Sequence, residues 1–339
     1  MSKLNVLVAG ATGYIGVQLV KLLLKHKKIN IKYLCGSSSI GKKISNYDIS
    51  IKKKLPIISK FTKSKLQDCD IIFTALPNGE AQKIAKHIPD QVKLIDLSAD
   101  FRLNNHRLYK KWYGIEHKSK KLINKSMYAV TEFSKKHLHK YKIISCPGCY
   151  QTSVQIPLIP LVRKKMINTK NIIIDSKSGY SGAGKNIKKK FKFKNLLSSV
   201  SAYGVGSHRH MVEIDQELSK VSKDRISVFF TPHLIPMFRG ILSTIYLETR
   251  GNNNAKKIFK TIKKYHKNNF FVKIARYNTP IGTGEVVNTN YCQISVCESR
   301  SLNKVIIICT IDNLIKGGSG QAVQNMNVAF GYDEKLGLK

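Results

Sequence analysis

The sequence is poor in acidic residues and has no long run made only of apolar ones. Its 339 residues include 59 lysines and arginines but only 20 aspartates and glutamates, which gives a formal net charge of +39 at pH 7. A membrane-spanning helix needs about 20 mainly apolar residues, and we expect none here. The opening stretch MSKLNVLVAG is apolar too briefly to be a signal peptide and is read as a first strand. We therefore expect a cytoplasmic protein without a membrane partner.

A framework of paired cysteines is also lacking. Seven cysteines is an odd number in a long chain without a secretion signal, which indicates reduced thiols. Outside the stretch SCPGCYQT, only Cys292 and Cys297 lie close together, and they fall inside a predicted strand. A zinc site would need two matched ligand pairs, so we expect no metal.

The excess of positive charge raises the question of nucleic acid, because clustered lysine and arginine are typical of a phosphate-binding surface. Here the lysines occur in nearly every segment, with only short runs such as IKKKL and NIKKKFKFK. That spread is typical of a general compositional bias, and we expect no nucleic-acid partner. A basic surface can still attract an anionic substrate without identifying it.

The order of predicted strands and helices differs between the two halves of the chain. Up to about residue 147, apolar strands at Leu4–Ala9, Ile31–Cys35 and around Ile72 and Leu94 alternate with helical patterns, which predicts a doubly wound parallel sheet of the Rossmann type. After Cys149, strands follow one another with few helices, which favours an α+β domain with a mixed or antiparallel sheet. We predict a nucleotide-binding domain over residues 1–147, a catalytic and oligomerisation domain over 148–312, and a C-terminal helical segment over 313–339 that could belong to either domain.

The stretch GATGYIG follows the first predicted strand and opens a helix. Glycines at 10, 13 and 16 allow a pyrophosphate to approach the backbone at a helix N-terminus. Tight turns that bind no ligand also use glycine for steric reasons. The strand before this turn and the amphipathic helix after it nevertheless favour a dinucleotide site. The residues predicted to line it are Gly10, Thr12, Gly13, Tyr14, Ile15 and Gly16.

The end of the second strand bears on the choice of cofactor. A site for NAD has an acidic residue there to hold the ribose 2′-hydroxyl. This chain has Ser37, Ser38 and Ser39 instead, followed by two lysines. Hydroxyl and ammonium groups suit a 2′-phosphate, so the sequence favours NADP(H).

The stretch SCPGCYQT places Cys149 at the start of a helix-like segment. A helix N-terminus lowers the pKa of a thiol, because its N–H groups stabilise the thiolate. Pro157 and Pro160 would kink the helix beyond its first turn. Cys146 is most simply the buried end of a strand.

Several segments offer partners for such a thiol. His208 and His210 stand two apart before an amphipathic helix, and either is a possible acid/base; His233 and Arg239 lie in a later strand and turn. Arg102 could either pair with Asp100 or hold a phosphate or carboxylate through its planar fork. The loop SGYSGAGK, which contains Gly182, could be a flexible turn or a backbone approach to cofactor or substrate.

These motifs in this order resemble the N-acetyl-gamma-glutamyl-phosphate reductase family, a relative of aspartate-semialdehyde dehydrogenase. The resemblance covers nearly the whole chain. It lies in GATGYIG, DLSADFR, CPGCYQTS, SGYSGAG, HRHMVEI, TPHLIPMFRGILST and DNLIKGGSGQAVQNMN. One departure is Ala129, where the family more often has glycine.

The resemblance implies an NADPH-dependent reduction of an acyl phosphate to an aldehyde in arginine biosynthesis, through a thioester on Cys149. It implies His210 or His208 as acid/base, with the former preferred. It further implies substrate contacts from Arg102, Gln151 and Arg239, and cofactor contacts from Gly182, Asn313 and Asn325. It also implies that the segment 313–339 returns to the nucleotide-binding domain.

Alternatives stay open at this stage. One is aspartate-semialdehyde dehydrogenase, and another is a related acyl-phosphate reductase of lysine synthesis. A third, non-enzymatic one is a dinucleotide-sensing binding protein, which would not need a reactive thiol. The strand-rich second domain favours a homodimer or homotetramer.

Overall fold

A computed structural model describes residues 3–185, 187, 194–195 and 198–339. The chain divides into two compact units, one formed by residues 1–147 and 318–339 and the other by residues 148–317. Each is described by itself. Among the described helices, none is long and apolar enough to cross a membrane.

The first unit is built on a six-stranded sheet with the order β2-β1-β3-β4-β6-β5, in which every neighbouring pair is parallel. Its strands are β1 (Leu4–Ala9), β2 (Ile29–Cys35), β3 (Ile71–Thr74), β4 (Lys93–Asp96), β5 (Ser126–Tyr128) and β6 (Ile143–Ser145). Its helices are α1 (Tyr14–Leu24), α2 (Ala81–Ala85), α3 (His106–Tyr113), α4 (Lys120–Ile123), α5 (Thr131–Ser134) and α10 (Gly320–Ala329). Short 3-10 turns are η1 (Ile44–Asn46), η2 (Lys63–Leu66) and η3 (Leu138–Lys140).

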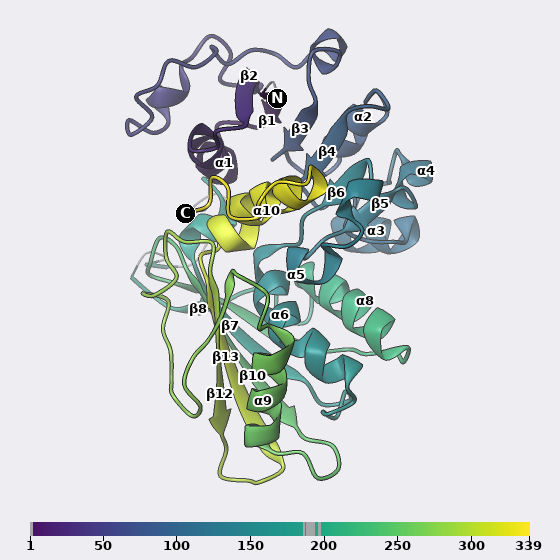
Figure 1. The fold of residues 1–339 in the computed structure, drawn as a ribbon, viewed down its shortest axis with the longest axis vertical. Helices are drawn as coiled ribbons and strands as arrows, with labels where there is room; N and C mark the ends of the chain where they lie inside the picture. Colours follow the sequence, from purple (N-terminus) through teal and green to yellow (C-terminus); the bar gives the residue numbers. More distant parts are fainter. Residues whose placement is uncertain (1–2, 186, 188–193, 196–197) are drawn as a thin grey trace. The chain divides into compact units, whose positions relative to one another are not determined.

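Helices cover this sheet on two faces. α1 packs on β1 and β2, and α10, drawn in yellow in Figure 1, packs on α1 and β4. Another cluster unites Leu7, Ile72 and Leu94 of the strands with Ile84 of α2. β3 is buried along its whole length and β1 over its last four residues, because parallel strands are covered on both faces.

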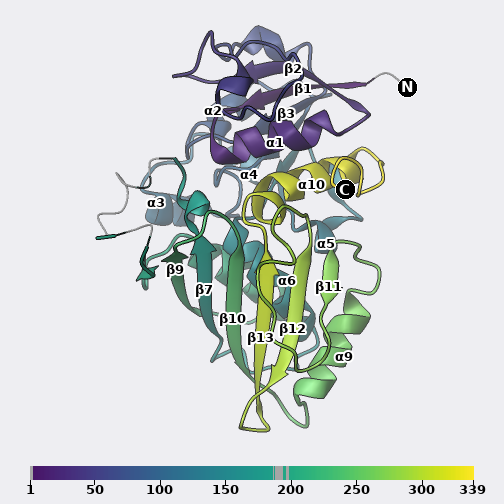
Figure 2. The same cartoon turned by 90° about the vertical axis from the view of Figure 1, so that its left-hand side faces the viewer.

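The second unit contains a seven-stranded mixed sheet with the order β11-β12-β13-β10-β7-β9-β8. Figure 2 shows β9, β7, β10, β13 and β12 side by side. The strands are β7 (Ile173–Gly179), β8 (Ser201–Ala202), β9 (Phe229–Ile235), β10 (Ile241–Glu248), β11 (Val272–Ile274), β12 (Cys292–Glu298) and β13 (Lys304–Ile311). The helices are α6 (Cys149–Arg163), α8 (His210–Ser222) and α9 (Ala255–Tyr265), with the 3-10 turn η4 (Tyr180–Ala183) and the π-helical turn η5 (Ile315–Ser319).

One face of this sheet is covered by helices and the other is open. α6 and α9 pack on the strands, and α8 packs on α6. Residues along β7 and β10 accordingly alternate between buried and more exposed positions. A parallel sheet in one unit and a mixed sheet in the other confirm the predicted fold class.

Helix α6, which carries Cys149, is tied to the sheet by three buried serines. Ser243 of β10 lies 2.7 Å, oxygen to oxygen, from both Ser153 of α6 and Ser176 of β7. All three are fully buried, so each hydroxyl needs a partner inside the protein. The chain of hydroxyl groups fixes the first half of α6 against the strands.

Candidate active site

Cys149 is the first residue of α6, as the sequence predicts. Gly148 precedes it in an extended conformation (φ −70°, ψ 165°) and caps the helix. The thiol is half-buried, and the backbone N–H groups of the first turn favour its ionised form. The helix continues through Pro157 and Pro160 to Arg163.

Cys146 has a different environment. It is fully buried just beyond β6, where Asn325 donates an amide hydrogen to its sulfur (3.6 Å). Burial raises the pKa of Cys146 to about 12, so this thiol stays protonated near neutral pH. These properties support the interpretation of Cys146 as a structural neighbour of the reactive thiol.

Two histidines lie beside each other where α8 begins. The ring centroids of His208 and His210 are 4.7 Å apart. The backbone N–H of His210 donates to Nδ1 of His208 at 3.1 Å. Nδ1 of His208 is therefore an acceptor, which places the proton of its neutral ring on Nε2.

Gly148 is the point on which His210 and Gln151 converge. A Cβ built on Gly148 would lie 2.7 Å from Nε2 of His210 and 2.3 Å from Oε1 of Gln151. A side chain at 148 would therefore collide with both groups. The ring nitrogen and the amide share the space beside the residue that precedes the nucleophile, and this geometry favours His210 over His208.

Gln151 has an unusual environment for an amide. Its side chain is fully buried, and neither Oε1 nor Nε2 has a hydrogen-bond partner within the described part of the chain. A buried amide without partners costs free energy on the order of 1–3 kcal/mol per group. An incoming carbonyl or hydroxyl group could satisfy it.

Two tyrosines near the thiol were missed by the sequence reasoning. The hydroxyl groups of Tyr150 and Tyr203 lie 3.1 Å apart. The ring centroid of Tyr150 lies 5.7 Å from the ring centroid of each histidine. Burial, and to a smaller degree the charge of Cys149, raises the pKa of both tyrosines, so their hydroxyls stay protonated. The position of Tyr150 directly after Cys149 was the available signal, while Tyr203 approaches from a distant loop.

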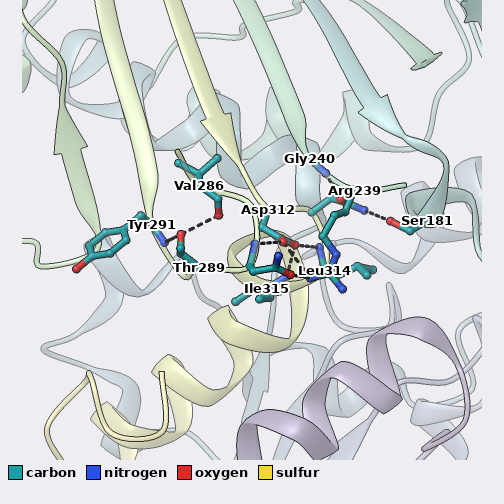
Figure 3. A network of polar contacts seen from close by, with 11 residues as sticks. Ser181, Arg239, Gly240, Val286, Thr289, Tyr291, Asp312, Leu314 and Ile315 are labelled. Carbon is teal, nitrogen blue, oxygen red and sulfur yellow. Dashed lines mark hydrogen bonds and ion pairs between the residues drawn. The ribbon is translucent and has the colours of Figure 1, made fainter. Parts of the chain in front are cut away.

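A polar network in the same unit contains Arg239, another predicted substrate residue (Figure 3). Nη1 of Arg239 donates to Oδ2 of Asp312 (3.1 Å) and to Oδ1 of Asn288 (2.9 Å). The guanidinium carbon lies 5.8 Å from the ring centroid of Phe238. Arg239 is thus held on three sides, and Asp312 was not singled out from the sequence.

Asn313 and Gly182 lie together beside this network. Asn313 accepts the N–H of Gly240 (2.7 Å) and donates to Oγ of Ser181 (2.9 Å). A Cβ on Gly182 would lie 3.5 Å from Nδ2 of Asn313. The side chain of Asn313 therefore shapes the glycine-rich loop, and the predicted cofactor contacts of both residues stay predictions.

In the first unit, the GATGYIG turn has the geometry of a backbone cradle. Gly10 has φ +84°, and a Cβ there would lie 2.2 Å from the carbonyl oxygen of Ala75. A Cβ on Gly16 would lie 2.1 Å from the carbonyl oxygen of Gly10. Gly13 caps α1, which starts at Tyr14, so the N-terminus of α1 follows the turn directly. This arrangement fits a bound pyrophosphate.

We expect Gly16→Ala to destabilise the protein by about 1–3 kcal/mol, because its methyl group meets backbone atoms that cannot yield. Gly13→Ala is the matched control: its Cβ would have no neighbour closer than 3.9 Å and its φ is −68°. It should melt like the wild type but bind NADPH more weakly, because the methyl group projects into the cradle. Thermal melts and NADPH titrations would check both; equal melting temperatures for the two variants would contradict the steric argument.

The serine cluster lies directly after β2. Ser37 and Ser38 are exposed, whereas Ser39 is buried and its hydroxyl has no hydrogen-bond partner within the described residues. The backbone N–H of Gly10 donates to the carbonyl oxygen of Cys35 at 2.9 Å, so the glycine turn adjoins the end of β2. The glycine turn and the serine cluster therefore lie side by side, and their contacts with a cofactor stay predictions.

Arg102 and Asn325 lie near Cys146 in the first unit. Arg102 is buried and donates from Nε to the carbonyl oxygen of Cys146 (2.9 Å) and from Nη2 to that of Leu97 (3.0 Å). Asn325 donates to the carbonyl oxygen of Ala129 (2.9 Å) and accepts from Thr131 (2.6 Å). The substrate contact of Arg102 and the cofactor contact of Asn325 stay predictions.

Asp100, the alternative partner considered for Arg102, binds other groups. It accepts the N–H groups of Gly79 (2.7 Å) and Gln82 (3.1 Å) and the hydroxyl of Tyr109 (2.6 Å). Within the described residues, no three histidine, cysteine or acidic side chains gather into a metal-ligand set.

Both units match models of known protein families. A family model described as semialdehyde dehydrogenase, NAD binding domain, matches residues 5–141. One described as semialdehyde dehydrogenase, dimerisation domain, matches residues 149–313.

Two bacterial relatives of nearly the same length share one name. N-acetyl-gamma-glutamyl-phosphate reductase of Ehrlichia ruminantium (strain Gardel) is 44% identical over 99% of this chain and 97% of its own length. The protein of that name in Thermoanaerobacter pseudethanolicus is 41% identical over 98% of this chain and 96% of its own. Among solved structures, aspartate semialdehyde dehydrogenase with NADP from Candida albicans superimposes with a TM-score of 0.67 at 17% identity, covering 96% of this chain and 98% of that one. The structural likeness supports the fold.

Proposed function

This chain belongs to the N-acetyl-gamma-glutamyl-phosphate reductase family, and we propose that it catalyses the reaction in that name. NADPH would reduce N-acetylglutamyl 5-phosphate to N-acetylglutamate 5-semialdehyde with release of phosphate, a step of arginine biosynthesis. The observation that carries the proposal is the half-buried thiol of Cys149 at a helix N-terminus, with the His210 ring and the Gln151 amide converging on Gly148, the residue before it.

The thiolate of Cys149 attacks the acyl carbon. The carbon–sulfur bond forms as the carbon–oxygen bond to phosphate breaks, which leaves a thioester on Cys149 and free phosphate. A thioester accepts hydride far more readily than a carboxylate, which is why a covalent route suits this reduction. When bound, NADPH supplies that hydride; the GATGYIG turn and the serines after β2 would hold it.

The other residues of the site handle protons and orientation. We assign proton transfer to and from the reacting oxygen to His210, as the tetrahedral thiohemiacetal on Cys149 forms and collapses to the aldehyde. The amide of Gln151 is assigned to orient the acyl group. Arg239 and Arg102 are proposed to bind the anionic groups of the substrate, because guanidinium matches phosphate and carboxylate geometry.

The reverse reaction tests the function. The protein should reduce NADP+ when given N-acetylglutamate 5-semialdehyde together with phosphate, and only weakly with aspartate semialdehyde. A higher kcat/KM for aspartate semialdehyde would contradict the proposal and favour aspartate-semialdehyde dehydrogenase activity instead. Loss of phosphate dependence would remove the acyl-phosphate chemistry altogether.

Cofactor choice gives a further prediction. Because Ser38 is exposed directly after β2, Ser38→Asp should place a carboxylate against the 2′-phosphate of NADPH. We expect kcat/KM with NADPH to fall by about tenfold or more while that with NADH is unchanged or rises. The matched control Ser38→Asn has similar volume without the charge. Equal effects of the two substitutions would contradict the electrostatic argument.

We also propose that the protein forms a homodimer through the open face of the mixed sheet, or a tetramer built from such dimers. The matching family model is a dimerisation domain. Phe229, Ile173, Tyr246 and Ile306 are register partners in a row across β9, β7, β10 and β13. The first three are 64%, 43% and 42% exposed, and a contiguous apolar row of this kind is typical of a protein interface.

Charge placed in that row should separate the subunits. We expect the double variant Ile173→Asp/Tyr246→Asp to sediment as a monomer where the wild type sediments as a dimer or larger. Leu302→Asp, at a position 92% exposed in the turn before β13, is the control and should leave the assembly unchanged. An unchanged sedimentation coefficient in the double variant would place the interface elsewhere.

A cytoplasmic location is proposed on chemical grounds. All seven cysteines are free thiols, which is the state that a reducing cytosol maintains. The expected lack of a nucleic-acid partner stays a prediction.

A further inference from the structure

Asp312 occupies a central position in the second unit. It directly follows β13 and is fully buried, and Figure 3 shows it between the turn that carries Arg239 and the turn that begins at Leu314. The inference below rests on the proposed function, because it concerns how the same site is held in place.

The carboxylate accepts four hydrogen bonds from three segments. Oδ1 accepts the backbone N–H groups of Leu314 (2.8 Å) and Ile315 (3.0 Å). Oδ2 accepts Nη1 of Arg239 (3.1 Å) and the backbone N–H of Asn288 (2.7 Å). A buried charge persists only with such compensation, so the carboxylate and its donors fix each other.

The first consequence concerns Arg239. Its side chain is 17% exposed, and Nη1 donates to oxygens of Asp312 and Asn288, which lie on other segments. An arginine held in one orientation loses less conformational entropy when it binds an anion. Asp312 therefore sets the direction in which the guanidinium fork faces.

The second consequence concerns the thiol. The carbonyl oxygen of Asp312 accepts the N–H of Gly317 (2.9 Å), so both its side chain and its backbone shape the same turn. A Cβ on Gly317 would lie 2.6 Å from Cβ of Cys149, which puts the turn in contact with the nucleophile. Asp312 thus links the guanidinium of Arg239 to the backbone that packs on Cys149.

We infer that Asp312 is a positioning residue for the reaction, which aligns the Arg239 fork and the Gly317 turn relative to Cys149. Asp312 itself does not touch substrate. Its removal should therefore act on substrate through Arg239 and on thiol reactivity through Gly317.

The test is a double-mutant cycle. Asp312→Asn keeps the shape but replaces one acceptor oxygen by an NH2 group, which faces donors whichever way the amide is turned. We expect the KM for N-acetylglutamate semialdehyde or phosphate to rise about tenfold or more, while the KM for NADP+ is unchanged. In an Arg239→Ala background, the same substitution should raise that KM by less than about threefold, because the interaction is already lost. Equal effects in both backgrounds would overturn the inference for Arg239.

A second variant tests the inference in case Asp312→Asn does not fold. Asn288 has φ +65°, a conformation that glycine adopts freely, so Asn288→Gly removes only the side-chain acceptor of Arg239. We expect the KM for the same substrate to rise and the kcat to stay within about twofold. An unchanged KM with an unchanged melting temperature would show that Arg239 needs no orientation from this network.

The alkylation rate of Cys149 separates this inference from the proposed function. Mass spectrometry after iodoacetamide treatment needs no turnover, so it reports on Cys149 even if the wild type does not reduce NADP+. Such a lack of activity would contradict the proposed function without deciding this inference. In Asp312→Asn, loosening of the Gly317 turn should speed alkylation by about threefold or more, whereas Asn288→Gly should match the wild type. Equal rates in all three proteins would overturn the link to Cys149.

Discussion

The Cys149→Ala variant is expected to have no measurable reductase activity. Without the thiol no thioester forms, and the remaining groups cannot make the acyl carbon an acceptor of hydride. Cys149→Ser should be nearly as inactive, because a hydroxyl group at neutral pH is almost fully protonated and a weaker nucleophile. NADPH binding should survive both changes, since the glycine turn lies outside this helix.

Cys146→Ala is the matched control for this loss. Its cost should be in packing, on the order of 1 kcal/mol, with activity per folded molecule retained. Mass spectrometry of the wild type mixed with acyl phosphate but no NADPH should find the acyl group on Cys149. The pKa of Cys146 is raised to about 12 by burial, so no adduct is expected there. An adduct on Cys146, or an inactive but folded Cys146→Ala, would favour a mechanism with two thiols.

The second large effect is expected at His210. Asparagine can replace Nδ1 of a histidine as an acceptor but has no group at the position of Nε2. His210→Asn therefore removes the nitrogen that lies beside Gly148, and we expect kcat to fall by about 10²–10⁴-fold with the loss of a limb of the pH–rate profile.

His208→Asn is designed to behave differently. Its Oδ1 can take over the hydrogen bond from the N–H of His210, so kcat should fall by less than about tenfold and the pH profile should keep its shape. Stopped-flow and steady-state assays across pH would compare the two variants. A larger loss in His208→Asn would exchange the assigned roles, which the sequence alone left open.

Local patterns predicted the parts of the site that local geometry creates. The close approach of Gly16 to the carbonyl oxygen of Gly10 and the helix that starts at Cys149 depend on neighbours in sequence, and each can be recognised in a short stretch. The roles of Asp312 and Tyr203 and the burial of the Gln151 amide depend on contacts between distant segments. Asp312, for example, accepts a hydrogen bond from Arg239, which is 73 residues away in the sequence. No sequence pattern around residue 312 predicts which donors will face its carboxylate.

The prolines in α6 have a consequence for tolerance to mutation far from the chemistry. Pro160 has no N–H to give the carbonyl oxygen of Ile156 four residues earlier, and Nε2 of the buried His266 lies 3.0 Å from that oxygen instead. His266 directly follows α9 and contributes no atom to the chemistry proposed here. A genetic screen for arginine prototrophy should nevertheless reject apolar residues at position 266. They would leave a backbone carbonyl oxygen without a hydrogen-bond donor in the helix that carries the nucleophile.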